Sequence, residues 1–398
     1  MLLLAGRAAA DTLVVRGVQV EGNERTDSGF VARALGVAPG EPFDPALVPV
    51  VEQRVMNLRL FREVHVEPVP DGAGGVILHV TVKERRTFVP VPVAGASRGV
   101  VGGGIFLLDS NLFGRGEQLA GGVFVSNRGT SVNLGYRDPG VAGTPLLLTA
   151  EVARVDMMRE QDAGLDTLYQ FQDRRWDYGA TVGWRVAEGL TVRGGWFGLI
   201  VDATPIAGFA PPPRVGPVRG LSGEIAYDGE DFHLWHVTGF STRVRYRQGV
   251  SWLATSRDLY QLSARATWST RALADHALSL SAGLDGSHGD PVVDALRLGG
   301  LPGSRGFIRG GLWAETAGTA TAEYQIPLRR LSWGVVTWAA FCDAGGVRWR
   351  GADTFYAAPG LGVRLYLRNV AIPVIGLDVA QATGVGAPVV SFAAGWRT

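Results

Sequence analysis

From Thr87 onward the chain consists of short segments in which apolar and polar residues alternate, separated by Gly, Asp, Asn and Pro. Between Tyr178 and Val186, for example, Tyr, Ala, Val, Trp and Val alternate with Gly, Thr, Gly and Arg, and residues 260–268 and 361–368 repeat the pattern. Because successive side chains of a strand point to opposite faces, each segment predicts a strand with one apolar and one polar face.

These alternating segments together predict a closed barrel in a membrane. Many apolar faces carry Trp or Tyr toward one end, as a membrane girdle does, while polar faces carry arginine, as at Arg243, Arg245 and Arg247. We count about sixteen segments over roughly 310 residues, which suits one transmembrane barrel. Lipid offers no partner to an open strand edge, so closure is expected. The alternative is a soluble β-rich domain, whose apolar faces would point inward without an aromatic rim.

Residues 11–86 show a different pattern and predict a small α+β domain with the order β-α-α-β-β. Alternation at 13–20, 61–67 and 76–82 predicts three strands. Thr26-Asp27-Ser28 is expected to cap a helix that runs through Leu35, and Asp44-Pro45 to open a second, one-sided helix. Such a unit leaves sheet edges open, and an open edge can accept an extended peptide as an added strand.

The first ten residues end in three alanines, which fit a small-residue cleavage site. Their apolar stretch is too short for a complete signal peptide and follows no basic residues, so we interpret residues 1–10 as the remnant of a secretory signal, with the start codon further upstream. A disordered terminus is the alternative. Eighteen apolar residues never run together, and no transmembrane helix is predicted.

Composition narrows the range of functions. Lys+Arg total 38 and Asp+Glu 37, a net charge of +1, so no overall field would recruit nucleic acid. The single cysteine, Cys342, excludes an internal disulfide. Glycine (56) and tryptophan (11) are abundant while charged residues make up 19%, as expected for strands between lipid and a crowded interior.

The glycine-rich segment Leu298–Gly311 is expected to be a shaped loop, because glycine and proline disfavour the interior of helices and strands. It belongs to a connection around 287–312 that is long for a barrel hairpin. If this connection folds back into the lumen, Arg305 needs buried carboxylates, since an unpaired buried cation is costly. Glu323 and Asp343, in the next two predicted strands, are the candidates; the alternative is that both are ordinary lumen-lining charges.

Several motifs resemble a known family. The element order of residues 11–86, with Gly17–Glu24, Leu60-Phe61 and Val80–Glu84, resembles a POTRA domain. The rest resembles the barrel of BamA- and TamA-type outer-membrane assembly factors, a superfamily that also holds the two-partner secretion transporters. The turns that resemble those after the family's second and fourth strands are Asp109–Gly116 and Arg137–Gly140.

The most specific match is the sixth extracellular loop of that family, which carries an Arg-Gly-Phe/Tyr signature and is held inside the barrel by two strand motifs. Ser304 departs from the usual aliphatic residue before the arginine. The resemblance therefore implies a latch between loop and strands. Its residues here are Arg305, Gly306 and Phe307 in the loop, Glu323 with Pro327 behind it, and Phe341, Asp343 and Gly345.

The resemblance also implies a weak seam between the first and last strands, here about 87–96 and 388–396. Pro90 and Pro92 cannot donate ladder hydrogen bonds, and Gly395, beside Trp396, adds little packing, so the residues themselves predict a poorly zipped seam. The alternative is that the prolines lie at the beginning of the strand, outside the ladder. By resemblance, the POTRA domain is periplasmic and the barrel lies in a Gram-negative outer membrane.

The implied function is insertion or translocation of polypeptides, without catalysis, cofactor or metal. Implied partners are outer-membrane lipid and lipopolysaccharide, unfolded outer-membrane or secreted clients, and periplasmic accessory proteins. The alternatives are a two-partner-type transporter with one dedicated client, a passive pore, and a membrane-embedded hydrolase. Residues 233–236 and 287–290 contain His or Ser-His-Asp groups, but no third metal ligand or oriented base accompanies them. Residues 156–162 are expected in a surface loop.

Overall fold

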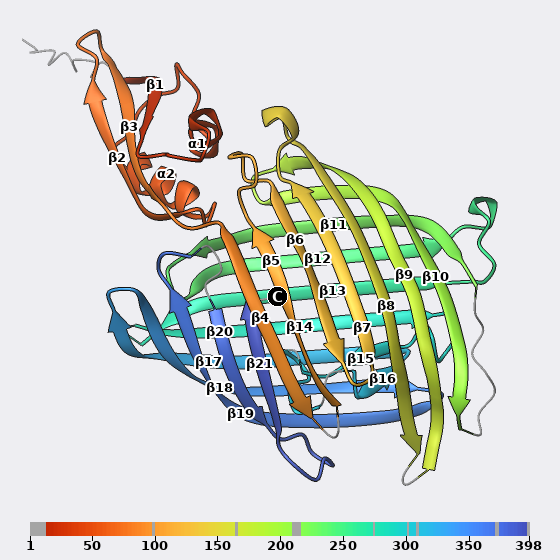
Figure 1. Cartoon of the computed structure of the whole chain (residues 1–398). Coiled ribbons are helices and arrows are strands. Elements are labelled where there is room, and N and C mark those ends of the chain that lie inside the picture. Colours follow the sequence, from red (N-terminus) through yellow and green to blue (C-terminus); the bar gives the residue numbers. More distant parts are fainter. Residues whose placement is uncertain are drawn as a thin grey trace, which may run out of the picture.

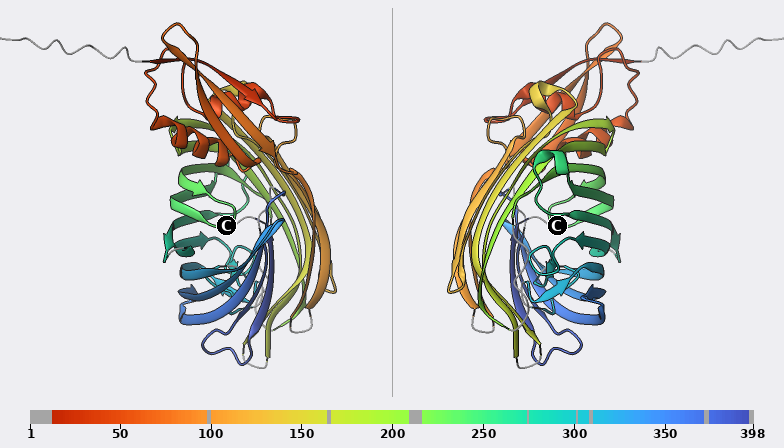
Figure 2. Two further views of the ribbon diagram at one scale, coloured as in Figure 1. Left: turned by 90° about the vertical axis from the view of Figure 1, so that its left-hand side faces the viewer. Right: turned by 90° about the vertical axis from the view of Figure 1, so that its right-hand side faces the viewer.

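The computed structural model describes residues 13–97, 100–163, 166–208, 216–273, 275–300, 302–307, 310–370 and 374–395. In these residues a small α+β domain is followed by one 16-stranded antiparallel sheet that curls into a barrel (Figure 1). Both views of Figure 2 show the small domain at one end of the barrel, which we call the near rim; the opposite end is the far rim.

The small domain has the predicted order β-α-α-β-β. Its sheet has the order β1-β3-β2, with β1 parallel and β2 antiparallel to β3. The Asp27 carboxylate accepts from the Phe30 N–H at 2.7 Å and caps α1, whereas Asp44 closes a turn onto Ala46 just before α2. The elements are β1 (Val14–Glu21), α1 (Ser28–Ala34), α2 (Leu47–Met56), β2 (Phe61–Pro70) and β3 (Gly75–Glu84).

Burial follows the predicted periodicity in this domain. Val31 of α1 and Val51 and Val55 of α2 have no exposed surface and pack on Val15 and Leu78 of the sheet. The one-sided apolar stripes of the helices thus cover one face of the three strands. The two described α-helices have 7 and 10 residues, and no described helix is long and apolar enough to cross a membrane.

The barrel wall is antiparallel from its first strand to its last, and each strand pairs with its sequence neighbours except where the long connection separates β14 from β17. The strands are β4 (Phe88–Ser97), β5 (Val100–Asp109), β6 (Gln118–Ser126), β7 (Gly129–Asp138), β8 (Leu146–Ala163), β9 (Asp166–Ala187), β10 (Leu190–Ala207), β11 (Val218–Phe232), β12 (Val237–Gly249), β13 (Tyr260–Ala272), β14 (His276–His288), β17 (Thr316–Leu331), β18 (Gly334–Trp349), β19 (Ala352–Leu367), β20 (Val374–Ala380) and β21 (Val389–Gly395).

The two faces of the barrel wall are opposite to those of a soluble domain. Val182 and Trp184 of β9 and Trp196 of β10 are about half exposed on the outer face, whereas Glu224 and Asp343 point inward and are buried. An apolar exterior around a polar interior is what a strand wall in lipid requires. The alternation seen in the sequence therefore corresponds to lipid-facing and lumen-facing sides.

The long connection predicted around 287–312 lies between His288, the last residue of β14, and Thr316, the first residue of β17. It contains a small hairpin of β15 (Leu296–Leu298) with β16 (Leu312–Ala314). Another prediction is wrong. Residues 156–162 are not a surface loop but part of the 18-residue β8. Strands β8 and β14 extend because a neighbouring strand supplies partners beyond the point where the apolar alternation fades.

The small domain contacts several connections of the near rim. The Asp27 N–H donates to Gly114 O at 2.7 Å after β5, and Arg54 pairs with Glu188 at 2.9 Å after β9. The Phe232 N–H at the end of β11 donates to the Asn57 side chain at 2.8 Å. The domain is therefore seated on the rim through polar contacts from both of its helices and the segments beside them.

Candidate functional site

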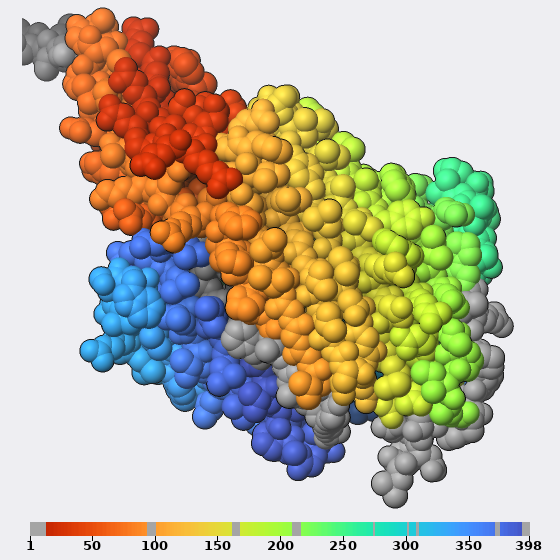
Figure 3. Space-filling model, viewed as in Figure 1, coloured from red at the N-terminus to blue at the C-terminus, as the bar shows by residue number. Residues whose placement is uncertain are grey.

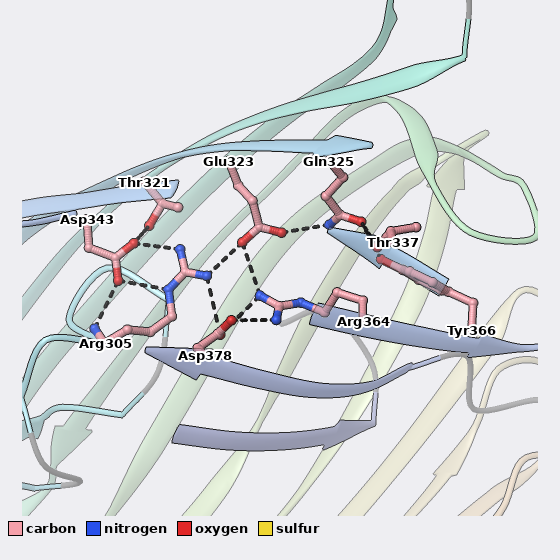
Figure 4. Close-up of polar contacts among 9 residues, drawn as sticks. All are labelled: Arg305, Thr321, Glu323, Gln325, Thr337, Asp343, Arg364, Tyr366 and Asp378. Carbon is pink, nitrogen blue, oxygen red and sulfur yellow. Dashed lines mark hydrogen bonds and ion pairs between the residues drawn. The ribbon is translucent and has the colours of Figure 1, made fainter. Parts of the chain in front are cut away.

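A buried ionic network on the lumenal side of β17–β20 joins the long connection to the wall (Figure 4). The Arg305 guanidinium donates from Nη2 and Nε to the two Asp343 oxygens at 2.8 and 3.0 Å, and from Nη1 to Glu323 at 2.7 Å. The Arg305 N–H also donates to Asp343 at 2.9 Å. Arg305 is 2% exposed, so these are charge-assisted bonds in a dry interior.

The network extends to residues that sequence reasoning did not assign to the site. Asp378 of β20 lies 3.6 Å from Arg305 Nη1, and Arg364 of β19 pairs with both Asp378 oxygens and reaches Glu323 at 3.5 Å. The available signal was a charged residue within each of two apolar alternating segments, 361–368 and 374–380, because such a charge must face the lumen. Polar side chains complete the network: Thr321, Gln325, Thr337 and Tyr366.

Aromatic rings and glycines shape the space around Arg305. Its guanidinium carbon lies 3.3 Å from the centroid of the Phe341 ring, a stacked cation–π contact. Gly306 has no room for a side chain, because an added Cβ would lie 2.6 Å from the Ala382 backbone nitrogen and 2.7 Å from the Ala358 Cβ. The loop therefore approaches the wall at backbone distance next to the arginine.

The remaining motif residues hold the next part of the loop. Phe307 meets the Tyr356 ring edge-on with centroids 4.9 Å apart, and the Tyr356 hydroxyl donates to Gly303 O at 2.5 Å. An added Cβ on Gly345 would lie 2.6 Å from that hydroxyl oxygen. Gly345 thus leaves the space in which Tyr356 reaches the loop.

The same connection is anchored a second time, on the opposite side of the lumen. Arg297 of β15 pairs with Asp173 of β9 at 3.4 Å, and Arg159 and Arg175 pair with the same carboxylate at 3.2 and 2.8 Å. Asp173 has no exposed surface. The sequence pattern did not predict this cluster. Asp173 lies in a charged segment, in which apolar and polar residues do not alternate and the lumenal face cannot be identified.

Apolar contacts accompany the second anchor. Val292 and Val293 of the connection are buried against Phe171 of β9, Phe197 of β10 and Leu259 before β13. The connection therefore crosses the lumen, from the β9–β13 wall to the β17–β20 wall. We call residues 289–315 the crossing loop; a small cavity of about 90 Å³ remains beside it at Arg175, Arg247 and Val293.

The first and last strands meet without pairing. In the described residues β4 and β21 form the two ends of the sheet order, although they lie next to each other (Figure 1). Figure 3 shows the orange surface of the first strands adjoining the blue surface of the last ones. Gly395 pairs with Val374 on the other side of β21, and Trp396 lies outside the described residues.

The two seam prolines lie inside the ladder of β4, opposite Leu107 and Ile105 of β5, which excludes the alternative that they precede it. The Ser110 N–H donates to Thr87 O at 3.2 Å, so odd-numbered residues of β4 direct their backbone groups toward β5. Even-numbered residues direct theirs toward β21. The missing donors of Pro90 and Pro92 therefore belong to the free edge.

The weaker constellations do not form a catalytic or metal site in the described residues. His233 stacks on His236 with centroids 4.6 Å apart, and the Ser287 hydroxyl donates to Asp294 O at 2.6 Å. His288 lies against Tyr260, and no described group of three His, Cys, Asp or Glu could hold a metal ion. These residues belong to the strand ends and turns that support the rims.

Comparisons with known proteins agree with this architecture. A family model described as "Omp85 superfamily domain" matches residues 111–368, and the POTRA model, "Surface antigen variable number repeat", matches residues 13–85. Among solved structures, BamA from Haemophilus ducreyi lacking POTRA domains 1-3 has a TM-score of 0.56 at 15% identity, covering 96% of this chain and 83% of that one. CdiB from Escherichia coli has a TM-score of 0.61 at 13% identity, covering 98% of this chain and 91% of that one.

Two curated relatives carry the description "Outer membrane protein assembly factor BamA". The protein of Neorickettsia risticii is 24% identical over 159 residues, and that of Nitratidesulfovibrio vulgaris 31% over 132 residues. These matches span 39% and 32% of this chain but only 21% and 16% of the relatives. The Omp85 match covers more than half of the chain and includes the crossing loop with Arg305, Glu323, Asp343 and Arg364, and the chain therefore belongs to the Omp85 superfamily.

Proposed function

We propose that this protein helps other polypeptides to insert into, or to cross, a Gram-negative outer membrane. In this proposal residues 11–86 are a periplasmic POTRA domain and residues 87–398 the membrane barrel, with the near rim on the periplasmic side. The observation that carries it is the combination of an occupied lumen with a first and a last strand that do not pair with each other in the described residues. A passive pore would need the opposite, an open lumen in a fully paired wall.

The mechanism that fits this combination is strand addition at the seam. The β4 edge offers backbone groups toward β21 that lack partners in the described chain, interrupted at two prolines. A client strand could pair with such an edge while its side chains move sideways into lipid, so that its backbone groups stay bonded throughout. One edge strand of the small domain, β2, offers a second edge at which a client could pair earlier, once the Glu52 carboxylate that accepts from the Val66 N–H is displaced.

The role of Arg305 in this proposal is that of a latch. It ties the crossing loop to β17, β18 and β20, which leaves the junction of β21 with β4 as the weakly joined part of the wall. No bond is made or broken, and no cofactor takes part. The partners are outer-membrane lipid and lipopolysaccharide, unfolded client polypeptides and periplasmic accessory proteins.

The proposal is tested by reconstitution. The purified chain in liposomes, given an unfolded barrel client, should raise the yield of protease-protected, folded client above that of empty liposomes. Variants with one cysteine in β4 and one in β21, in a Cys342→Ser background, are screened for a disulfide that closes the seam, and such a variant should lose this activity only when oxidised. No gain in folded client over empty liposomes, with any barrel supplied, contradicts insertion.

The alternatives give different results in the same system. A secretion transporter would move a dedicated exported protein into the liposome lumen without raising the yield of folded barrels. A passive pore would conduct ions in a way that Arg305→Ala leaves unchanged. A hydrolase would lose turnover on substitution of Ser287 or His288. In cells, depletion should lower the amount of other barrels or of one exported partner in the outer membrane.

A further inference from the structure

A buried arginine at the junction of the two domains has no counter-ion in the described chain. Arg85 is 5% exposed, and its Nε and Nη1 are enclosed without a hydrogen-bond partner among the described residues. Most buried polar groups in proteins are hydrogen-bonded, and a desolvated guanidinium without a partner strongly destabilises a fold. A group of this kind is expected to have a ligand.

The surroundings of Arg85 are cationic and aromatic. Two guanidiniums lie over the Phe232 ring, with the Arg85 carbon 5.0 Å and the Arg59 carbon 5.3 Å from its centroid. Arg368 lies near enough for its charge to act on Arg85, and its Nε is likewise enclosed without a partner in the described part of the chain. Burial, with the charges of Arg368 and Arg59, lowers the pKa of Arg85 to about 10, so it remains a cation at neutral pH.

The neighbouring carboxylates are already engaged with other groups. Glu230 lies 3.7 Å from Arg59 and accepts from the Ser241 hydroxyl at 2.6 Å. Glu63, which feels the charge of Arg368, pairs with Lys83. The cluster therefore has an excess of positive charge around Arg85.

The position of the cluster is fixed by three segments that meet at the near rim. The Arg85 N–H donates to Leu60 O at 2.8 Å in the small domain, and the next residue, Arg86, donates to Asn369 O at 2.9 Å after β19. Phe232 comes from the end of β11. The cluster thus lies where the small domain, the start of the first barrel strand and the rim come together.

We propose that Arg85 and Arg368 form an oxyanion-binding site at this junction, which takes a carboxylate or phosphate group. The planar fork of a guanidinium matches both groups through paired N–H donors, and the enclosed site strengthens each bond. The oxyanion comes either from a small free ion or from an acidic residue of a polypeptide at the rim. Only the second source rests on the proposed function.

The test is calorimetric titration of the purified full-length chain in detergent micelles. The probes are inorganic phosphate and a tetraglutamate peptide, with tetraglutamine as the uncharged control. Saturable binding of phosphate or tetraglutamate is expected, weakened tenfold or more in Arg85→Gln and Arg368→Gln. Arg62→Gln, which removes an exposed neighbour that donates to Asn369, should bind as wild type does.

The two charged probes separate the sources. Binding of phosphate alone indicates a free ion, whereas tighter binding of tetraglutamate indicates a polypeptide. Absence of saturable binding by the wild type, or equal binding by Arg85→Gln, overturns the site. If Arg85→Gln does not fold, the titration uses Arg85→Lys in its place, because this variant keeps the charge but lacks the paired N–H donors of the guanidinium. Because no client insertion is measured, failure here leaves the proposed function untouched.

Discussion

Arg305 balances the charge of a dry site that would otherwise be strongly acidic. Its guanidinium contacts Glu323, Asp343 and Asp378, which come from three different strands, and Arg364 is the second cation of the network. With Arg305 removed, three buried carboxylates would share one cation. Coulomb repulsion at low dielectric then opposes the packing of β17, β18 and β20 around the loop.

We predict that Arg305→Ala destabilises the barrel by about 3–5 kcal/mol, the range for breaking a buried ion pair from one side. Arg305→Lys should recover part of this loss, because it keeps the charge but not the two-pronged contact with Asp343. Urea unfolding in detergent micelles measures both. Arg271→Ala removes an exposed pair and should cost under about 1 kcal/mol; an equal loss in Arg305→Ala and Arg271→Ala would contradict a latch.

A second prediction concerns the glycine beside the arginine. Gly306→Ala should displace the loop even though every charged group remains, because the new methyl group would lie within 3 Å of the Ala382 backbone. We expect faster maleimide labelling of a cysteine placed at Ser304, which is 2% exposed, in a Cys342→Ser background. Gly135→Ala, where a Cβ meets nothing within 4 Å, is the matched control and should leave labelling unchanged.

The sequence predicted three of the five charged residues of the network around Arg305. Glu323 and Asp343 could be predicted because each interrupts an apolar segment on its lumenal face. Arg305 could be predicted because a buried cation needs partners. Arg364 and Asp378 met the same criterion, but the resemblance concerned only the loop and two strand motifs. The pairing of Arg297 with Asp173 depends on where the loop lands across the lumen, which no local pattern encodes.

At the scale of elements, the crossing loop acts as a strut with two unlike ends. One end is ionic and contacts β17–β20; the other combines the Asp173 cluster with buried valines and rings on β9–β13. Release of either end should leave the loop tethered by the other. The lumen should therefore open by degrees, depending on which anchor is lost.

We predict that Asp173→Asn raises the ion conductance of the barrel in planar bilayers, because Arg159, Arg175 and Arg297 would repel one another without their shared carboxylate. The Arg305 latch would persist, so the unfolding midpoint should fall less than in Arg305→Ala. Asp156→Asn, on the neighbouring strand and partly exposed, serves as the control. Conductance equal to that of the wild type would show that the second anchor does not restrict the lumen.

The strands themselves were well predicted by alternation, and their ends were not. Apolar and polar residues alternate wherever one face of a strand meets lipid and the other meets the lumen. This alternation therefore identified the barrel and its two faces. The alternation fades outside the lipid. There β8 and β14 nevertheless continue, because the neighbouring strands β9 and β13 pair with them. The short hairpin of β15 with β16 lies inside a loop of glycines, and only its contacts with the walls hold it as strands.

At the scale of the whole molecule, one part of the wall is rigid and another is weakly joined. The small domain contacts rim connections after β5, β9, β11 and β19, and the latch holds β17 and β18. Between these supports, β4 and β21 adjoin without pairing in the described residues. The weakest line in the barrel is therefore the seam, and the residues that keep it weak can be changed.

We predict that replacing Pro90 and Pro92 by threonine strengthens the seam and impairs client insertion. Both prolines face the β21 edge, so each threonine restores one backbone donor there, worth about 0.5–1.5 kcal/mol once paired. The temperature at which the barrel unfolds on semi-native gels should rise while the yield of folded client falls. Pro205→Thr, in β10 away from the seam, should change neither quantity. If insertion stays at the wild-type level in a barrel that has become more stable, the seam is not the route by which clients reach the membrane.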